Sequence, residues 1–365
     1  MKRKLNQLPA ALIVAASLAL SGCAAAQNSD QSGPPSSGQP ANGPITVTDM
    51  AGRTVTVPAQ VETVATVGLV PPVNSVVFAL GMAPKVVNSP PGNWSETWMN
   101  YPILAPNTLD APMLEATING DVDHEELLKL DPDVVIASGE EMANDIEALG
   151  IPTVVVQTGA ELNKQAVTLL GEVFGRQDLA REYTEYYDAA VAKLSEVGAA
   201  AGKDDHPSLL YLSVSDPMRR PAVTVDWAAL KLGAHPVTGS VTEGGWYEFN
   251  LEQLLAWDPE VLITMFPSDE ETLKTDERFS LLQAVQSGRI YTTPVGAQLW
   301  GQTTTENALG FLWLAKTLYP EQAADIDLTK ETKYFYSTFF GVDLTDAQVD
   351  RMLAAQPPAP DGQSS

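Results

Sequence analysis

A sequence motif that occurs twice constrains the fold of this 365-residue chain more than any other feature. The segment 123–138 returns at 250–265 in the same spacing, with Glu, Leu, Leu, Asp, Pro, Val and Ile identical in place. The apolar run that ends each copy lacks polar alternation, which predicts a strand covered on both faces of a parallel sheet. A repeat at this distance is too long for a solenoid, so it predicts two α/β lobes built alike.

Each copy begins with a pattern typical of a helix N-terminus. Asp123 and Asn250 suit N-caps, and Glu126 and Gln253, three residues later, suit capping-box partners. The Asp-Pro pair that follows predicts the helix end, because the residue before proline is disfavoured in the helical conformation. Each copy is therefore predicted to form a short helix, a turn and a buried strand.

The first residues of the chain are typical of an export signal. Residues 1–22 have a positively charged start and an apolar core that is too short to span a bilayer comfortably. They end in Leu-Ser-Gly before Cys23, which resembles a lipobox and predicts a lipoprotein signal peptide, with a lipid on Cys23 after cleavage. The alternative is an ordinary secretory signal with an incidental cysteine. Because Cys23 is the single cysteine, neither an intramolecular disulfide nor a cysteine metal site can form.

Composition and length predict the domain plan. Residues 23–44 are rich in Ser, Gly, Pro, Gln and Asn and predict a flexible tether. The remainder exceeds the usual size of a single core, which predicts an N-terminal α/β lobe over 45–158 and a C-terminal α/β lobe over 204–355. Apolar residues at helical spacing predict a stiff helical connector within 159–203. Residues 356–365 predict a disordered polar tail.

The net charge of the chain limits the classes of partner that it can bind. It has 21 basic and 46 acidic residues and a net charge of −25, which becomes −28 when the signal removes its three basic residues. Such a charge argues against nucleic acid and anionic lipid surfaces as partners. It does not identify a ligand, since an acidic surface is usually just a soluble one.

Several motifs together resemble one family. These are the lipobox, the hairpin Asp49-x-x-Gly-Arg53 that ends at Pro58, the doubled Glu-x-Leu-Leu-x-x-Asp-Pro phrase and the single connecting helix. The chain resembles the class III substrate-binding proteins of ABC importers, which bind ferric siderophores, haem, cobalamin and related chelates. The segment 325–345 is similar to members described as iron-complex binders. The resemblance implies two Rossmann-like α/β lobes with parallel sheets, joined by one long helix, in a monomer that is not an enzyme and has no intrinsic cofactor.

The resemblance also implies a partner for Glu125 and Glu252. Both occupy the second helical position of their copy, where the third-position residue is the one expected to cap. In the family, a glutamate at this place on each lobe docks into arginine pockets of the membrane permease, whose own ATPase supplies the energy. The alternative is that acidic residues merely favour helix N-termini.

Aromatic residues in predicted loops are candidates for the walls of a ligand cleft, because they can stack on a bulky chelate. Ligands of such folds bind between lobes, beyond the carboxyl ends of the strands. Packing beneath a loop is the alternative for each residue. The candidates are Trp94, Trp98, Tyr101, Trp246 and Trp300.

Met218, Arg219 and Arg220 follow the first predicted strand of the C-terminal lobe and are further ligand candidates. Guanidinium groups pair well with carboxylate or catecholate oxygens, so the two arginines are compatible with an anionic ligand. A structural pairing with nearby acidic residues is the alternative.

Histidines give no sign of a metal site. His124, His206 and His235 are scattered, whereas a bare zinc or manganese site normally needs clustered His and carboxylate ligands. Haem remains possible through Tyr101 or Tyr247 as axial ligand, and nothing in the sequence selects either.

The expected function is therefore capture of a metal chelate, first a ferric siderophore, then haem or cobalamin, then a small nickel or cobalt chelate. The phosphate-binding Gly-rich and Gly-x-Ser-x-Gly motifs are absent from the sequence. A two-lobed enzyme of the chelatase or nitrogenase-like type is the first alternative, although it would need cluster cysteines or a conspicuous histidine. A surface adhesion lipoprotein without a small-molecule cleft is the second.

Overall fold

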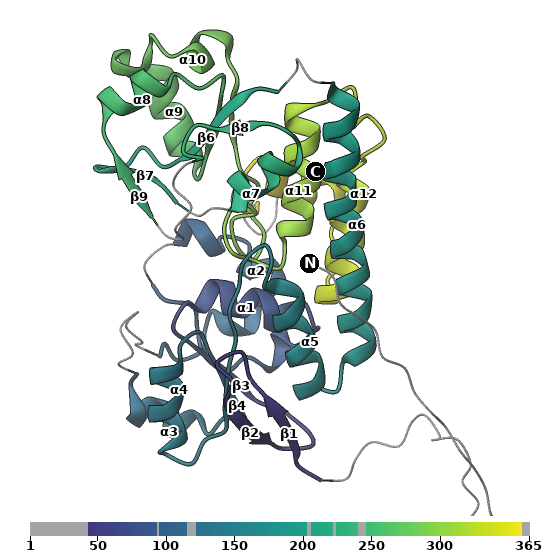
Figure 1. Ribbon diagram of the computed structural model, residues 1–365. Coiled ribbons are helices and arrows are strands. Elements are labelled where there is room, and N and C mark those ends of the chain that lie inside the picture. Colours follow the sequence, from purple (N-terminus) through teal and green to yellow (C-terminus); the bar gives the residue numbers. More distant parts are fainter. Residues whose placement is uncertain are drawn as a thin grey trace, which may run out of the picture. The chain divides into compact units, whose positions relative to one another are not determined.

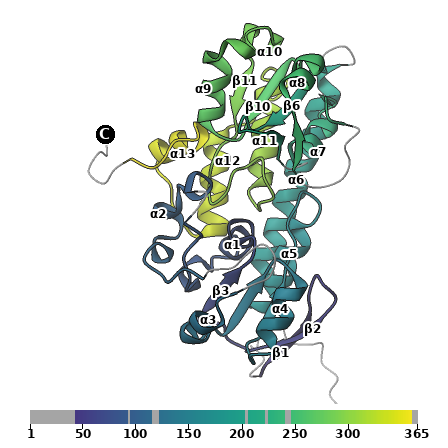
Figure 2. The same ribbon diagram turned by 90° about the vertical axis from the view of Figure 1, so that its left-hand side faces the viewer.

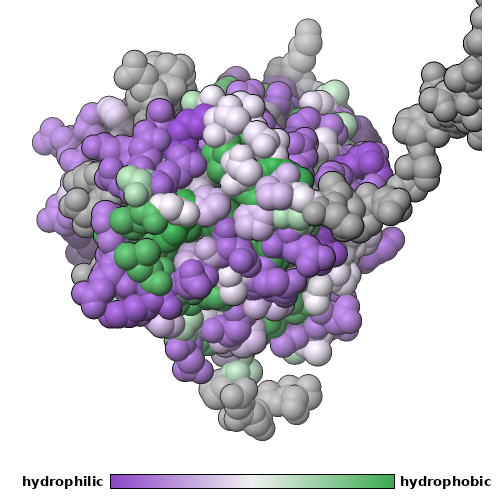
Figure 3. All heavy atoms as spheres, turned by 90° about the horizontal axis from the view of Figure 1, so that it is seen from below, coloured by the Kyte–Doolittle hydropathy of each residue, from purple (hydrophilic) through white to green (hydrophobic). Residues whose placement is uncertain are grey.

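The computed structural model describes residues 43–92, 95–114, 122–202, 206–221, 224–239 and 246–359 (Figure 1). Cys23, Trp94 and the predicted signal and tether up to residue 42 lie outside these residues. No helix among the described residues is long and apolar enough to cross a membrane. The surface seen from below is mainly hydrophilic, with hydrophobic side chains in small patches (Figure 3).

The N-terminal lobe is built on a parallel sheet with strand order β3-β4-β5, and a separate antiparallel hairpin β1-β2 precedes it. All residues of β3, β4 and β5 are buried, as expected for strands covered on both faces. The elements of this lobe are β1 (Ile45–Thr48), β2 (Thr54–Val57), β3 (Val64–Val67), α1 (Val70–Phe78), η1 (Ala83–Lys85), η2 (Ser95–Trp98), α2 (Tyr101–Leu104), η3 (Pro106–Thr108), α3 (His124–Leu130), β4 (Val134–Ala137), α4 (Glu140–Glu147) and β5 (Thr153–Val155).

The C-terminal lobe has a parallel sheet with strand order β11-β10-β6-β8. A two-stranded antiparallel ribbon, β7-β9, is a feature that the sequence did not predict. The elements are β6 (Ser208–Leu212), β7 (Met218–Arg220), α7 (Thr224–Lys231), β8 (His235–Pro236), β9 (Tyr247–Phe249), α8 (Leu251–Trp257), β10 (Val261–Thr264), α9 (Pro267–Thr275), η4 (Glu277–Phe279), α10 (Gln283–Ser287), β11 (Ile290–Thr292), α11 (Asn307–Leu318), α12 (Leu328–Phe335), the π-helical turn η5 (Tyr336–Phe340) and α13 (Asp346–Leu353).

The connector consists of α5 (Asn163–Val173) and the 25-residue α6 (Gln177–Ala201). At 1.5 Å per residue α6 is about 37 Å long. It packs on α5 and on α11 and runs along the side of the molecule away from α3 and α8 (Figures 1 and 2). The fold prediction of two α/β lobes with parallel sheets and one long connecting helix is confirmed.

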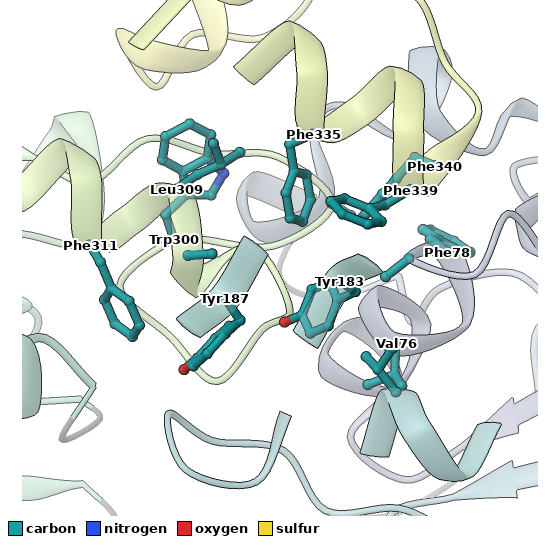
Figure 4. Packing of buried hydrophobic residues seen from close by; sticks show 14 of the residues in the cluster. Val76, Phe78, Tyr183, Tyr187, Trp300, Leu309, Phe311, Phe335, Phe339 and Phe340 are labelled. Atoms are coloured by element: carbon teal, nitrogen blue, oxygen red, sulfur yellow. The ribbon is translucent and has the colours of Figure 1, made fainter. Parts of the chain in front are cut away.

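One hydrophobic core extends through the connector into both lobes. Tyr183 of α6 has its ring 5.5 Å from Phe339 and lies in the same cluster as Phe78 of the N-terminal lobe and Phe311 of the C-terminal lobe (Figure 4). Phe78 in turn contacts Phe340 edge-on, with 6.1 Å between ring centroids. The lobes are therefore joined by shared packing as well as by the chain.

The two copies of the repeat fold as predicted, with one correction. Asn250 and Gln253 form a complete capping box, whereas at α3 only the Asp123 half is formed, by acceptance from the N–H of Glu126. The side chain of Glu126 turns instead towards Lys129, 3.5 Å away. A nearby cation is thus a better partner for this carboxylate than the N-cap N–H.

The acid after the proline of each copy has a structural duty that the sequence did not reveal. Asp133 Oδ2 accepts from the N–H groups of Glu62 (2.7 Å) and Thr63 (2.9 Å), just before β3. Glu260 Oε2 accepts from the N–H of Ser208 (2.8 Å) at the start of β6. In both lobes this acid therefore fixes the beginning of the neighbouring strand.

Candidate functional site

The carboxyl ends of the strands define one edge of each sheet, where ligands of open α/β sheets bind. In the N-terminal lobe, Ser138 follows β4 and its Oγ accepts from the N–H of Leu69, 2.9 Å away, just after β3. Gly68 lies between, with φ +83°, and a Cβ there would come within 2.2 Å of Ser138 Oγ. Only glycine fits this close approach, so the backbone itself forms part of the edge.

Asp269 occupies the corresponding edge of the C-terminal lobe. It lies in the first turn of α9, and its Oδ1 accepts from the N–H of Val214 (2.8 Å) and the hydroxyl of Ser213 (3.4 Å), just past β6. Its Oδ2 is buried and has no hydrogen-bond partner in the described part of the chain. Burial raises the pKa of Asp269, these donors lower it, and the carboxylate of Glu96 in the N-terminal lobe raises it further.

The β7-β9 ribbon brings together two residues that the sequence predicted separately. Arg219 and Ser213 exchange backbone hydrogen bonds of 2.8 and 3.0 Å, which attach the ribbon to the end of β6. The Arg219 guanidinium lies over Trp246, with 5.6 Å from Cζ to the ring centroid, and its Nε lies 3.7 Å from a carboxylate oxygen of Glu248. Arg219 Nε is buried and donates no hydrogen bond to any described group. Met218, on the same strand, is half-buried.

Trp98 is the described aromatic candidate of the N-terminal lobe that keeps partial exposure. It lies in η2 with Glu96, whose carboxylate acts electrostatically on Asp269, so η2 faces the carboxyl edge of the C-terminal lobe. Its ring lies 5.9 Å from that of Tyr101, and its buried Nε1 has no partner among the described groups.

Three other ligand candidates lie in the core. Tyr101 is fully buried, and its hydroxyl accepts from Asn74 Nδ2 at 3.1 Å. Arg220 is fully buried, with Nη1 3.3 Å from Asp226 Oδ2; burial raises the pKa of Asp226 to about 6 although Arg220 lowers it. Trp300 is 1% exposed. In this conformation all three support the fold beneath the edge and do not reach solvent.

The sequence missed a buried polar network around Glu306, at the start of α11. Its carboxylate accepts from the N–H groups of Ala297 (2.8 Å) and Gln298 (3.0 Å), from the hydroxyl of Thr304 (2.9 Å) and from that of Tyr336. Burial raises the pKa of Glu306 to about 7, although these donors lower it. The run Thr304-Thr305-Glu306-Asn307 before an apolar helix was the available signal, since such residues favour helix starts.

The same network joins the lobes. Asn100 of the N-terminal lobe donates to the carbonyl of Val295 at 2.7 Å, and the Thr305 hydroxyl donates to the carbonyl of Ser75 at 2.8 Å. Both acceptors and donors are buried. The loop that follows β11 is therefore held from both lobes.

The two predicted docking glutamates are exposed. Glu125 is 83% exposed and lies 3.0 Å from Lys129, one turn later on α3. Glu252 is exposed in the first turn of α8 and takes part in no ion pair within the described residues. One turn later, each helix carries an exposed leucine, Leu128 and Leu255.

Two of the three histidines, distant in sequence, meet in the fold. The rings of His206 and His235 lie 6.2 Å apart, because their segments run side by side at β6 and β8. His206 Nδ1 also lies 3.2 Å from the hydroxyl of Tyr319. No set of three His, Cys, Asp or Glu side chains suited to a metal ion occurs within the described ranges. Tyr247 is half-buried and packs on Trp257, with 6.4 Å between ring centroids.

Two cavities among the described residues offer little to a ligand. A cavity of ≈ 10 Å³ lies beside Trp300 and Phe311, room for about one water molecule. A shallow hollow of ≈ 520 Å³ lies on the outer side of α6, beside Tyr186 and Tyr334. The small cavity touches the carboxyl edge of the C-terminal sheet at Thr293, directly after β11, whereas the residues that line the hollow lie on α6 and α12.

Comparison with known proteins agrees with this architecture. Residues 73–295 match the model of the periplasmic binding protein family. The molybdate-binding protein MolA of Haemophilus influenzae is 26% identical over 325 residues, covering 80% of this chain and 90% of the relative. An uncharacterised ABC transporter substrate-binding lipoprotein of Bacillus subtilis is 21% identical over 287 residues, covering 76% and 86%.

A solved periplasmic solute-binding protein from Veillonella parvula superimposes with a TM-score of 0.73 at 25% identity, covering 85% of this chain and 97% of that structure. The relatives are named as binding proteins, so the prediction of a binding protein in place of an enzyme is confirmed. The chain belongs to the periplasmic binding protein family.

Proposed function

We propose that this chain is the substrate-binding lipoprotein of an ABC importer and that it carries a metal chelate, first of all a ferric siderophore, between its lobes. The observation that carries the proposal is the polar and aromatic lining of the two carboxyl edges. Trp98 belongs to one lobe. Met218 and Arg219 belong to the ribbon of the other, and Trp246 directly precedes that ribbon's second strand. Partly exposed aromatic rings beside an arginine suit a bulky chelate with oxygen ligands.

The partner is a membrane permease with its ATPase, and the docking points are Glu125 and Glu252. Support comes from their exposure at equivalent positions of the two repeat copies. A relative named as an ABC transporter substrate-binding lipoprotein supports the same assembly.

The proposed anchor is a lipid on Cys23, followed by the tether 23–44, and it holds a monomeric binding protein on the outer side of the membrane. Mass spectrometry of the protein purified from membranes should find the lipid on Cys23, and Cys23→Ser should release the protein from the membrane fraction. A mature chain that begins elsewhere would contradict the anchor and would leave the binding function standing.

Molybdate is a second candidate ligand. The relative that covers 80% of this chain is named for binding molybdate, and Arg219 Nε donates no hydrogen bond to any described group. An oxyanion of this kind is held by hydrogen-bond donors.

Titration of tryptophan fluorescence separates the candidates, because Trp98 and Trp246 lie at the two edges. The panel consists of ferric siderophores, haem, cobalamin, nickel–histidine and molybdate. The expected result is saturable quenching by an iron chelate that is lost in Trp246→Ala and kept in Trp313→Phe, a conservative change of a buried tryptophan of α11. Quenching by molybdate alone would replace the chelate by the oxyanion, and no response to any compound would contradict both.

A further inference from the structure

Three polar atoms at the carboxyl edges are buried without hydrogen-bond partners among the described residues: Trp98 Nε1, Arg219 Nε and Asp269 Oδ2. Buried polar atoms are nearly always paired in native proteins, so unpaired ones call for a specific explanation. They come from both lobes, Trp98 from η2 and the other two from the C-terminal carboxyl edge, and ligands of open α/β sheets bind at such edges. They therefore describe the hydrogen bonds that a ligand would complete: two acceptors for Trp98 and Arg219, and one donor for Asp269.

The position of Asp269 is well defined. Residue Asp269 is 7% exposed, and Oδ1 is held by the N–H of Val214 and the hydroxyl of Ser213. This leaves Oδ2 as a preorganised acceptor of fixed direction. A bare oxyanion offers only acceptors, so it would leave Oδ2 unpaired and would place like charges together.

The charges around the edges point the same way. Glu96 lies in η2, two residues before Trp98, and acts electrostatically on Asp269. Glu140 and Glu141 are exposed in the first turn of α4, directly after β4. The ribbon carries two cations, and each already has an acid beside it: Glu248 faces Arg219, and Asp226 pairs with the buried Arg220. The described edges therefore carry more negative than positive charge, which repels anions and attracts cations.

We propose that the ligand is an electroneutral or cationic metal chelate that gives a hydrogen bond or a positive group to Asp269 Oδ2, and that anionic ligands are excluded. This inference rests on the proposed chelate-binding function. It decides for the chelate and against molybdate, the second candidate above. It also reverses the expectation that the pair Arg219 and Arg220 favours an anion, because Asp226 already neutralises Arg220 in the core.

The test uses four probes that differ in charge, titrated by calorimetry against the full mature chain. They are a ferric trihydroxamate with a free ammonium group, an electroneutral ferric trihydroxamate, a ferric tricatecholate and molybdate. The wild type is expected to bind the first two and to bind the anionic tricatecholate and molybdate at least about tenfold more weakly, the size of effect expected from one unfavourable contact with a charged group.

Two variants assign the preference to residues. Asp269→Asn keeps an acceptor for Val214 N–H, and it should weaken binding of the ammonium-bearing chelate by about tenfold and improve binding of the tricatecholate. Glu96 is exposed on the other lobe. Glu96→Gln should shift the ratio of the two affinities, for the ammonium-bearing chelate and for the tricatecholate, by a smaller factor that disappears at high salt. Glu271→Gln is the matched control, since it removes an exposed charge from the same helix as Asp269.

The outcomes are distinct. Tighter binding of the tricatecholate or of molybdate than of the electroneutral chelate would overturn the inference and keep a binding protein. An unchanged charge preference in folded Asp269→Asn, with the melting curve of the wild type, would overturn the role of Asp269. Binding of none of the four probes, haem or cobalamin would overturn the proposed function itself.

Discussion

The two copies of the repeat, α3–β4 and α8–β10, agree in their interior and differ at their surface. Leu127 and Leu254 are fully buried, and Asp133 and Glu260 both fix the start of the neighbouring strand. At the surface, Glu125 is paired with Lys129, whereas Ala256 occupies the equivalent place on α8 and leaves Glu252 without such a partner. Acids with a structural duty can thus be separated from acids that are available to a partner.

The largest expected effect comes from reversing the available charges. Glu125→Arg or Glu252→Arg should reduce uptake of the chelate in cells to the background of a strain lacking the protein, because a like charge at a cationic permease pocket is repelled. Chelate affinity of the purified variants should equal that of the wild type. Glu271→Arg, an exposed reversal on α9, should leave uptake intact. A loss of affinity in either docking variant would mean that these acids serve the ligand site.

The buried positions test whether the copies are equal in the core. Leu127→Ala and Leu254→Ala should each lower the free energy of unfolding by about 2–5 kcal/mol, since each leaves a cavity in a closed core. Leu281→Ala, at a 74% exposed position, is the control and should change little. Denaturant unfolding followed by circular dichroism measures all three. If the two buried variants lose very different amounts of unfolding free energy, one lobe relaxes around its cavity and the other does not.

Glu306 belongs to the C-terminal lobe alone and should make its stability depend on pH. Burial raises the pKa of Glu306 from 4.5 to about 7, so the folded protein holds this proton more tightly than the unfolded chain. The stabilisation is present below about pH 4.5 and is lost as pH rises through about 7, an effect of about 3 kcal/mol. Urea unfolding at pH 5 and pH 8 should show this decrease in the wild type and a smaller one in Glu306→Gln. An equal decrease in the free energy of unfolding between pH 5 and pH 8 in both proteins would rule out the titration of Glu306 as its cause.

The acids after the prolines should have intermediate, matched effects. Asp133→Ala and Glu260→Ala leave the half-buried N–H groups of Thr63 and Ser208 unpaired, which should cost about 1–3 kcal/mol each. Thermal unfolding measures the loss, and ligand affinity should not change. A loss in one lobe only would contradict the equivalence of the two copies.

The smallest expected effect concerns Lys129. Lys129→Ala makes α3 resemble α8, and it should leave the melting temperature unchanged because an exposed ion pair contributes little. It should strengthen association with the permease at low salt, since Glu125 loses its competing partner. Lys274→Ala removes a comparable one-turn ion pair on α9 and is the control. Weaker association in Lys129→Ala would show that the lysine itself contacts the permease.

Local chemistry explains what could be predicted from the sequence. Three kinds of feature depend only on neighbours within a few residues. They are the N-caps Asp123 and Asn250, the unbroken apolar runs of β4 and β10, and the helical spacing of apolar residues in α6. These features predicted the lobes, the connector and the family.

Long-range pairing explains the rest. Arg220 has an acid six residues away as its partner, but its burial depends on the packing of the whole lobe. Glu306 takes donors from three segments, and the ribbon joins strands of three residues that have no periodicity to detect. Exposure of loop aromatics is set in the same way, so Trp98 and Trp300 looked alike in sequence and differ in the fold.

The core shared by both lobes has a consequence for docking kinetics. Because Tyr183 and its neighbours join the lobes, α3 and α8 belong to one body and move together. If the proposed docking holds, binding of one helix presents the other to its own pocket at a high effective concentration, with little further loss of translational and rotational freedom. Two weak contacts then act as one strong attachment, and breaking either one is enough to let the protein leave.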